Sequence, residues 1–242
     1  MSSIVSKGVS VFFPVHNEVD TIEGLVRSAA ALLPRCTPSP ELIVVDDGST
    51  DGSSHLLDHL ATEIPFMRVI HHEVNRGYGA ALKSGFRAAT RDLVFYTDGD
   101  GQFDFNEIQE VLRWADEYPV ISCYRTRRQD PIHRLINARL YEWAIWLILG
   151  LNIRDPDCAF KLYDRALVDR MSLTSDGALI DVEMLLQAHR AGCRIKQIGV
   201  SHFARVAGRS SGANLRVIMK AFWELFGVWH RYGGRFRGRP VR

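Results

Sequence analysis

The sequence predicts an α/β protein, organised as one domain around a mostly parallel, doubly wound sheet with helices on both faces. Short apolar runs alternate with segments of helical spacing through the first half of the chain, which is the pattern of repeated strand–helix–strand units. The apolar runs are continuous, as expected for strands that are buried on both faces. Of the 242 residues, 46% are hydrophobic and 24% are charged, which is the composition of an ordinary globular protein with a sizeable core.

Polar breaks follow each apolar run in the first half of the chain. We expect strands at Val9–Pro14, Glu41–Val45, Met67–His71, Asp92–Tyr96 and Val120–Tyr124. Helical spacing predicts helices over Thr21–Leu33, after the Asp46–Asp51 segment, over Gly77–Ala89 and over Glu107–Glu117. Ser49 or Asp51 is expected to cap the second of these helices, because a short side chain with an oxygen can accept a hydrogen bond from the first turn.

The second half of the chain is less regular. Its expected elements are a helix over Pro131–Leu151 with an apolar middle, a loop running into a strand over Asp155–Tyr163, a helix over Asp181–Ala191, a strand over Ile195–Val200 and a final amphipathic helix over Asn214–Tyr232. No repeat or low-complexity linker divides the chain. We therefore expect residues 1–213 to form the main domain, with 214–242 as a C-terminal amphipathic helix and basic tail packed on or beside it.

Charge and cysteine content narrow the class of protein. The formal net charge of +2 argues neither for nor against nucleic acid. An arginine-rich tail is typical of a solvated terminus or of contact with an anionic surface; a nucleic-acid binder would rest on this tail alone, and no nucleic-acid partner is expected. The four cysteines form no CxxC pair, which disfavours a zinc site or disulfide framework and fits a reducing cytosol. The N-terminus lacks the pattern of a signal peptide. The longest uncharged apolar stretch, 143–153, is far shorter than the roughly 20 residues that span a bilayer.

The polar residues that end the predicted strands indicate one binding cleft. The expected strands end in polar or charged residues, which are Asn17–Glu18, Asp46–Asp47, Asp98–Asp100, and Arg125 with Arg127. In a parallel sheet the carboxyl ends of the strands meet at one edge, where ligands bind. We therefore expect these separate groups to line the same cleft.

Asp98, Asp100 and Gln102 form the central motif of this cleft. Hard oxygen ligands at a strand end suit Mg²⁺ or Mn²⁺, and such an ion bridges to a diphosphate. The alternative is a plain Asp-Gly turn, because this dipeptide is common in loops. Asp46–Asp51 also has two interpretations, a helix cap with a turn or a carboxylate that binds a base or ribose hydroxyl. Pro14 ends strand pairing, so that Glu18 beyond it can face a nucleotide.

The motifs together carry a family resemblance. Pro-x-x-Asn-Glu begins at Pro14, Asp-Asp-Gly-Ser-x-Asp at Asp46, Asn-x-Gly-x-Gly-x-Ala at Asn75 and Asp-x-Asp-x-Gln at Asp98. In this order they resemble family 2 glycosyltransferases with the A-type fold, over roughly Val9 to Asn214. The Gln at position 102 makes the chain most similar to the branch of dolichol-phosphate mannose synthase and the polyprenyl-phosphate glycosyltransferases.

The resemblance implies a role for each motif. It implies a nucleotide pocket at Pro14, His16, Glu18, Val45, Asp47 and Asp98, and a metal site for Mg²⁺ or Mn²⁺ at Asp98, Asp100 and Gln102. It also implies inverting transfer of a hexose from a nucleotide sugar, GDP-mannose or UDP-glucose, to a polyprenyl or dolichyl phosphate. The residues expected to act on the reacting groups are Asp100, Arg125, Arg205 and Asp157.

Two later segments extend the likeness, and each departs from it at one position. Asp155–Lys161 is similar to the acceptor-side loop of the family, but Ala159 stands where Gly is usual. Arg205–Gly212 resembles the segment Arg-x-x-Gly-x-Ser, but Ser211 stands where a Lys often follows. Binding of the acceptor phosphate is therefore expected to depend on Arg205, Arg209 and Ser210.

The nature of the acceptor decides whether a base is required. A phosphate is ionised near neutral pH and attacks directly, whereas a hydroxyl needs a carboxylate to take its proton. Asp157, Asp181 and Glu183 are available for the second case. Transfer to a hydroxyl of a soluble or glycan acceptor is therefore the main alternative, and a non-catalytic module that binds nucleotide sugars is another.

A polyprenyl phosphate lies in a bilayer, so the chain has to reach a membrane surface. The expected helices near 132–151 and 215–232 carry aromatic residues, namely Trp143 and Trp146 in the first and Phe222, Trp223, Phe226 and Trp229 in the second. Amphipathic aromatic helices bind interfaces; the alternative is that the same side chains pack onto the sheet. We expect a cytoplasmic protein held peripherally on the cytoplasmic face of a membrane, directly or through a separate membrane-anchoring partner.

Overall fold

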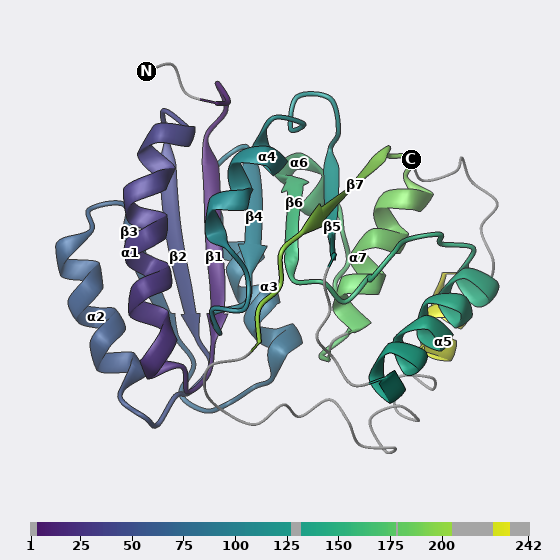
Figure 1. The fold of residues 1–242 in the computed structure, drawn as a ribbon, viewed down its shortest axis with the longest axis horizontal. Helices are drawn as coiled ribbons and strands as arrows, with labels where there is room; N and C mark the ends of the chain where they lie inside the picture. The colour runs from purple at the N-terminus through teal and green to yellow at the C-terminus, as the bar shows by residue number, and fades with distance from the viewer. Residues whose placement is uncertain (1–3, 127–131, 178, 205–224, 233–242) are drawn as a thin grey trace.

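The computed structural model describes residues 4–126, 132–177, 179–204 and 225–232, with side chains from residue 137 onward in the second range. A seven-stranded sheet runs through the molecule in the order β3-β2-β1-β4-β6-β5-β7 (Figure 1). The strands are β1 Val9–Val15, β2 Pro40–Asp46, β3 Met67–His71, β4 Leu93–Thr97, β5 Val120–Arg125, β6 Phe160–Asp164 and β7 Ile195–Val200. Every strand expected from the apolar runs is present, which confirms the α/β class.

Strand β6 is the exception in an otherwise parallel sheet. It runs antiparallel to both of its neighbours, β4 and β5, while the other neighbouring strands are parallel. Thr97 at the end of β4 lies opposite Phe160 at the start of β6. The loop that precedes β6 therefore emerges at the edge where the parallel strands end, which is the edge that binds ligands in such sheets.

Helices cover both faces of the sheet (Figure 1). Phe12 and Phe13 are consecutive in β1 and therefore point to opposite faces. The ring of Phe12 lies 4.9 Å from that of Phe86 in helix α3, and the ring of Phe13 lies 5.7 Å from that of Phe105. All four rings are buried. This burial on two sides confirms the double winding and explains why the strand sequences are continuously apolar.

The helices follow the predicted spacing, with a difference at the start of α2. They are α1 Val19–Cys36, α2 Ser53–Glu63, α3 Tyr78–Ala88, the 3₁₀ turn η1 Phe105–Glu107, α4 Ile108–Leu112, α5 Ile132–Leu149, α6 Arg165–Val168 and α7 Leu179–Arg190. The N-cap of α2 is Gly52 rather than Ser49 or Asp51, because the chain turns there with a φ of 101°, which favours glycine. The Asp51 carboxylate instead accepts hydrogen bonds from the Ser53 and Val19 N–H groups.

One expected helix ends earlier than predicted, and only part of another lies among the described residues. The helix expected to reach Glu117 ends at Leu112, and Trp114 and Ala115 then bond to carbonyls three residues back. In the expected C-terminal helix, residues 225–231 are helical, and Leu225 and Val228 are buried. The remainder of that helix and the expected domain boundary at residue 213 lie outside the described residues. Among the described helices, none is long and apolar enough to cross a membrane.

Candidate functional site

The ends of β1, β2 and β4 are joined by hydrogen bonds into one edge. The Asp47 N–H donates to the Val15 carbonyl at 2.8 Å, and the Gly99 N–H donates to the Pro14 carbonyl at 3.3 Å. The Thr21 hydroxyl lies 3.4 Å from Glu18 Oε2 and 3.3 Å from the Gly99 carbonyl. The structure thus brings Pro14, Glu18, Asp47 and Asp98 to one edge of the sheet, as expected.

Glycine is required between the two aspartates of the central motif. A Cβ atom at Gly99 would lie 2.7 Å from Val15 Cγ2 and 3.0 Å from the Pro14 carbonyl oxygen. Both distances are shorter than ordinary van der Waals contact. The close approach of the two strand ends therefore depends on the missing side chain.

Asp98 and Asp100 are the residues at this edge that could hold a divalent cation. Asp98 Oδ1 is buried and has no hydrogen-bond partner among the described residues, and a buried polar atom of this kind needs an explanation. Burial raises the pKa of Asp98 to about 8, and the negative charges of Asp100 and Asp181 act in the same direction. The positive charge of Lys161 and a hydrogen bond from Tyr78 partly offset this rise. A cation at Asp98 would oppose this shift, because it stabilises the ionised carboxylate.

The donor set fits Mg²⁺ or Mn²⁺ completed by a substrate. In the ranges that the structure describes, no group of three or more His, Cys, Asp or Glu residues is placed to hold a metal ion. Mg²⁺ usually binds through one or two carboxylates and takes its other oxygens from water and substrate phosphates. Asp98 and Asp100 can supply those carboxylates, and Asp100 is held in place because its Oδ1 accepts the Gln102 N–H at 3.1 Å.

A buried lysine lies behind this pair. Lys161 is fully buried, and its Nζ donates to Asp181 Oδ1 at 2.6 Å, to the Cys158 carbonyl at 2.5 Å and to the Tyr96 hydroxyl at 3.3 Å. The Tyr96 hydroxyl also donates to Asp181. Sequence analysis did not identify Lys161, although a lysine within the apolar run of β6 was a usable signal. Because Lys161 and Tyr96 occupy Asp181, this carboxylate is not the available base that the sequence predicted.

The other two acids considered as bases have different environments. Glu183 is fully buried and accepts the N–H groups of Thr174 and Ser175 at 3.0 and 2.8 Å, as well as a bond from Tyr232 at 3.1 Å. The prediction that Glu183 is an available base is therefore wrong. Asp157 keeps solvent-exposed surface, but the protein packed closely around its carboxyl group, followed by the charge of Asp181, raises its pKa to about 7.

The aspartates at the end of β2 organise the neighbouring loops. Asp47 accepts hydrogen bonds from His72 Nδ1 at 2.6 Å and from the N–H groups of Arg76 and Gly77 at 2.9 and 2.8 Å. Asp46 accepts from the Ser49 N–H at 3.0 Å. The turn interpretation thus covers part of this motif. The contact between Asp47 and a nucleotide stays a prediction.

Three other residues expected in the nucleotide pocket differ in exposure. Pro14 and Val45 are buried as partners in β1 and β2, where they support the edge of the sheet. His16 is exposed, and its Nδ1 lies 2.9 Å from the Asp47 carbonyl. Sequence analysis did not single out His72, which bridges Asp47 and the Ser84 hydroxyl; its position directly after an apolar run was the available signal.

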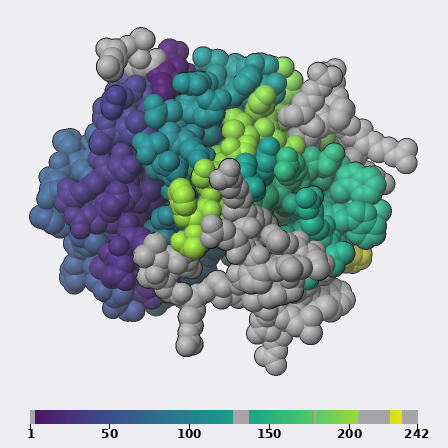
Figure 2. All heavy atoms as spheres, in the orientation of Figure 1, coloured from purple at the N-terminus to yellow at the C-terminus, as the bar shows by residue number. Residues whose placement is uncertain are grey.

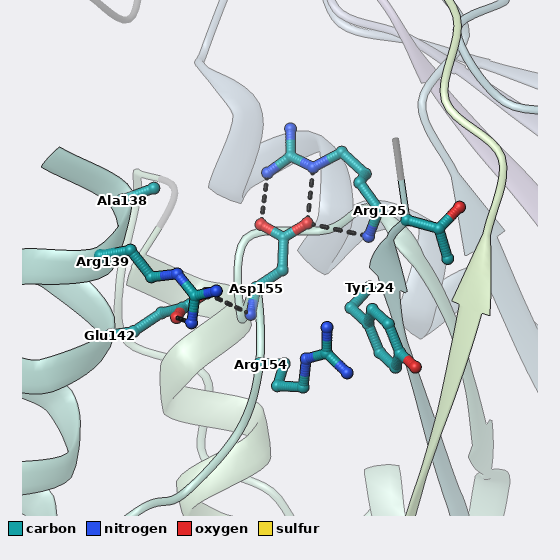
Figure 3. A pocket seen from close by; sticks show the side chains of 8 residues that line it. Tyr124, Arg125, Ala138, Arg139, Glu142, Arg154 and Asp155 are labelled. Carbon is teal, nitrogen blue, oxygen red and sulfur yellow. Dashed lines mark hydrogen bonds and ion pairs between the residues drawn. The ribbon is translucent and has the colours of Figure 1, made fainter. Parts of the chain in front are cut away.

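Arg125 lies in a polar pocket at the end of β5 (Figure 3). Its Nε and Nη2 atoms bind the two oxygens of Asp155 at 2.6 and 2.5 Å, and its backbone N–H donates to the same carboxylate at 3.1 Å. Burial lowers the pKa of the Arg125 guanidinium, but its hydrogen bonds and charge interaction with Asp155 are stronger. The net result is a pKa above the usual value for arginine. Asp155, which the sequence analysis did not single out, is positioned in turn because its N–H donates to Glu142 Oε1 at 2.8 Å.

The pocket has a volume of about 310 Å³ and an excess of basic groups. Three arginines and two acids are among the side chains that line it, which are Tyr124, Arg125, Thr126, Ala138, Arg139, Glu142, Arg154 and Asp155. The Arg154 guanidinium lies 3.8 Å above the ring of Tyr124, and Arg139 and Glu142 come from α5 (Figure 3). The pocket therefore combines cationic groups from β5, from α5 and from the loop before β6.

The residues expected to bind the acceptor phosphate, Arg205, Arg209 and Ser210, lie outside the described residues. The described chain before them is held against the metal motif, because the Phe203 N–H donates to the Gln102 carbonyl at 2.8 Å. In Figure 2 the yellow-green segment that contains β7 crosses the middle of the face shown, between the N-terminal half and α5.

Comparison with known proteins identifies the family. Residues 10–174 match the model of glycosyl transferase family 2. The chain belongs to this family. The match includes the ends of β1, β2 and β4 and the pocket at Arg125, whereas Asp181, Glu183 and Phe203 follow it in the chain.

The relatives and structural neighbours agree with this assignment. The chain is 31% identical over 215 residues to the undecaprenyl-phosphate 4-deoxy-4-formamido-L-arabinose transferases of Yersinia pestis (strain Pestoides F) and Yersinia pseudotuberculosis (serotype O:3, strain YPIII), covering 88% of this chain and 64% of theirs. It thus spans less than two thirds of these relatives. Glucosyl-3-phosphoglycerate synthase from Mycobacterium tuberculosis, in complex with Mg²⁺ and UDP, superposes with a TM-score of 0.71 at 20% identity, over 91% of this chain and 80% of that one. This likeness confirms the A-type fold.

Proposed function

We propose that this family 2 chain transfers a hexose from a nucleotide sugar to a polyprenyl phosphate, with inversion at the anomeric carbon and with Mg²⁺ or Mn²⁺. The observation that carries the proposal is the buried oxygen of Asp98 beside Asp100 at the strand ends, which has no hydrogen-bond partner in the part of the chain that the structure describes. The printed names of the Yersinia relatives support an undecaprenyl-phosphate acceptor. Structures of the M. tuberculosis neighbour with Mg²⁺ or Mn²⁺ and UDP support a metal and a nucleotide.

The donor side is assigned to the ends of β1, β2 and β4. Asp98, Asp100 and Gln102 would hold the divalent ion, which stabilises negative charge on the departing diphosphate. Glu18 and the exposed His16 would contact the nucleoside part of the donor. Asp47 acts from behind these residues, because its carboxylate already holds the loop before α3.

The acceptor side is assigned to the pocket at Arg125 and the exposed face of α5. Leu140, Trp143 and Leu147 are 56%, 57% and 43% exposed, whereas Ala144 and Ile145 of the same helix are buried. A spacing of three and four residues places the exposed side chains on one stripe. An apolar stripe beside a basic pocket suits a lipid whose phosphate enters the pocket and whose chain stays in the bilayer. We propose that the chain sits peripherally on the cytoplasmic face of a membrane, alone or with an anchoring partner.

The pocket supplies what a phosphate nucleophile needs. An ionised phosphate attacks without a base, and planar guanidinium groups bind it with two hydrogen bonds each. Arg154 and the remaining donors of Arg125 provide such groups, and Arg205, Arg209 and Ser210 are proposed to add to them. The in-line attack then inverts the configuration at the anomeric carbon.

Asp157 supports the alternative acceptor. A carboxylate with a pKa of about 7 and an exposed surface is suited to take a proton from a hydroxyl acceptor. Asp157→Asn separates the two functions. Transfer to a polyprenyl phosphate should continue in this variant if phosphate is the nucleophile. Transfer to a hydroxyl acceptor should instead fall by about 10²–10⁴ if Asp157 is the base that deprotonates it.

The decisive experiment offers the chain a panel of nucleotide sugars with Mg²⁺ or Mn²⁺ and a short polyprenyl phosphate. We expect radiolabel from one donor to move into the lipid phase, and chelation of the metal to stop the transfer. Label that appears only in soluble products would contradict the lipid acceptor. Transfer that persists after chelation would contradict the role of Asp98 and Asp100.

A further inference from the structure

Two hydrogen bonds between Gln102 and Phe203 connect the metal motif, Asp98–Gln102, to the segment that follows β7. The Gln102 carbonyl accepts the Phe203 N–H at 2.8 Å, and the Gln102 side-chain Nε2 donates to the Phe203 carbonyl at 3.0 Å. Between these bonds, Phe103 and His202 form an antiparallel bridge. The Gln102 N–H also donates to Asp100 Oδ1 at 3.1 Å. The backbone and the side chain of Gln102 are therefore both held in place.

Glu107 binds the same segment two residues before Phe203, at Ser201. Its two carboxylate oxygens lie 3.1 and 3.0 Å from the nitrogen of Ser201, whose N–H they accept. Ser201 is the first residue after β7, and Glu107 is the last residue of η1. A hydrogen bond to an ionised carboxylate is about twice as strong as one between neutral groups. Glu107 thus fixes the path of the chain that carries Phe203.

The orientation of the Gln102 carboxamide follows from this path. A backbone carbonyl only accepts hydrogen bonds, so the amide presents its nitrogen to Phe203 and its oxygen is free of that bond. That oxygen is the atom that a hard cation takes from glutamine. Groups that orient a metal ligand matter for the metal, because losing one typically lowers metal affinity about 10–100-fold.

We propose that Glu107 is a positioning residue of the metal site. Through Ser201 and Phe203 it holds the Gln102 carboxamide so that its oxygen is presented as a ligand. The inference rests on the proposed function, since it requires that Asp98, Asp100 and Gln102 bind a divalent ion. It extends that function by coupling the metal motif to the end of β7.

Binding of Mn²⁺ in the presence of UDP or GDP tests the proposal without any transfer reaction, because electron paramagnetic resonance measures the free ion. We expect Glu107→Ala to weaken Mn²⁺ binding about tenfold. Glu107→Gln should recover most of the affinity, since its amide oxygen still accepts the Ser201 N–H. Glu110→Ala is the matched control: Glu110 lies three residues later, carries the same charge and pairs on the surface with Arg113, so this variant should bind like the wild type.

Hydrogen–deuterium exchange gives a second readout. Glu107→Ala should speed exchange at the Ser201 and Phe203 amides and leave the amides of β4 protected. If this variant does not fold, Ser201→Pro removes the same hydrogen bond from the other side and should weaken Mn²⁺ binding equally.

Unchanged Mn²⁺ affinity in Glu107→Ala would overturn the positioning role while leaving the metal site intact. Equal weakening in Glu107→Gln would also overturn it, because charge rather than bracing would then be responsible. Failure of the wild-type chain to bind Mn²⁺ with either nucleotide would overturn the metal site itself, and this inference with it.

Discussion

The buried ion pair between Lys161 and Asp181 leads to a quantitative prediction for stability. Lys161 is fully buried, and its Nζ lies 2.6 Å from Asp181 Oδ1. Lys161→Met keeps most of the apolar volume but leaves Asp181 buried without its cation. Breaking a buried pair from one side costs about 3–5 kcal/mol, and the lost bond to the Cys158 carbonyl acts in the same direction. We expect the free energy of unfolding to fall by about 3–5 kcal/mol.

Equilibrium urea denaturation, followed by tryptophan fluorescence, measures this loss against two controls. Lys83→Met breaks a pair with the same 2.6 Å distance, in which Lys83 is 14% exposed but its partner Asp176 is 83% exposed. This variant leaves no buried charge behind, so it should cost about 0–1 kcal/mol. The double variant Lys161→Met/Asp181→Asn removes both charges and should recover most of the loss, because no buried charge is left without a partner. If Lys161→Met lost no more stability than Lys83→Met, the reasoning from burial would be refuted.

Other predictions concern the pH dependence, the close approach at Gly99 and the exposed stripe. Asp98 has a pKa near 8 in the folded chain, so it binds a proton more readily there than in the unfolded chain. The free energy of unfolding without metal should therefore fall as the pH rises from about 4 to 8. Asp98→Asn should flatten this pH dependence, which urea titrations at a series of pH values measure. Gly99→Ala should destabilise the folded chain by about 1–3 kcal/mol through overpacking. Gly24→Ala is the control, because a Cβ there meets open space in α1, and it should stabilise the chain by up to about 1 kcal/mol. Thermal melting of the two variants measures both effects. Trp143→Ser/Leu147→Ser should lose flotation with anionic vesicles at an unchanged melting temperature, and undiminished flotation would contradict the membrane proposal.

The sheet and its polar edge could be predicted from the sequence because both depend on local pattern. Asp98, Asp100 and Gln102 lie within five residues, so their common position needs only one strand end. Asp47 shows where local pattern stops being sufficient. Its place at the end of β2 was predictable, but its bonds to the amides of Arg76 and Gly77, 29 and 30 residues later, depend on how α3 packs.

Pairs that join distant elements could not be predicted. Lys161 meets Asp181 across 20 residues, and Arg125 meets Asp155 across 30. Nothing near Lys161 in the sequence shows which of the 28 acidic residues is its partner. The choice follows from the position of β6 between β4 and β5, which is a property of the whole topology.

The reversed direction of β6 means that the loop before it can change in length while the paired strands β1, β2 and β4 cannot shift against one another. Donor-side residues follow the ends of β1, β2 and β4, whose registers constrain one another. The loop with Asp155 and Asp157 instead leads into a strand, so its length can change without shifting that register. An insertion ahead of Phe160 is therefore expected to change the proposed acceptor side and to leave the ends of β1, β2 and β4 in register.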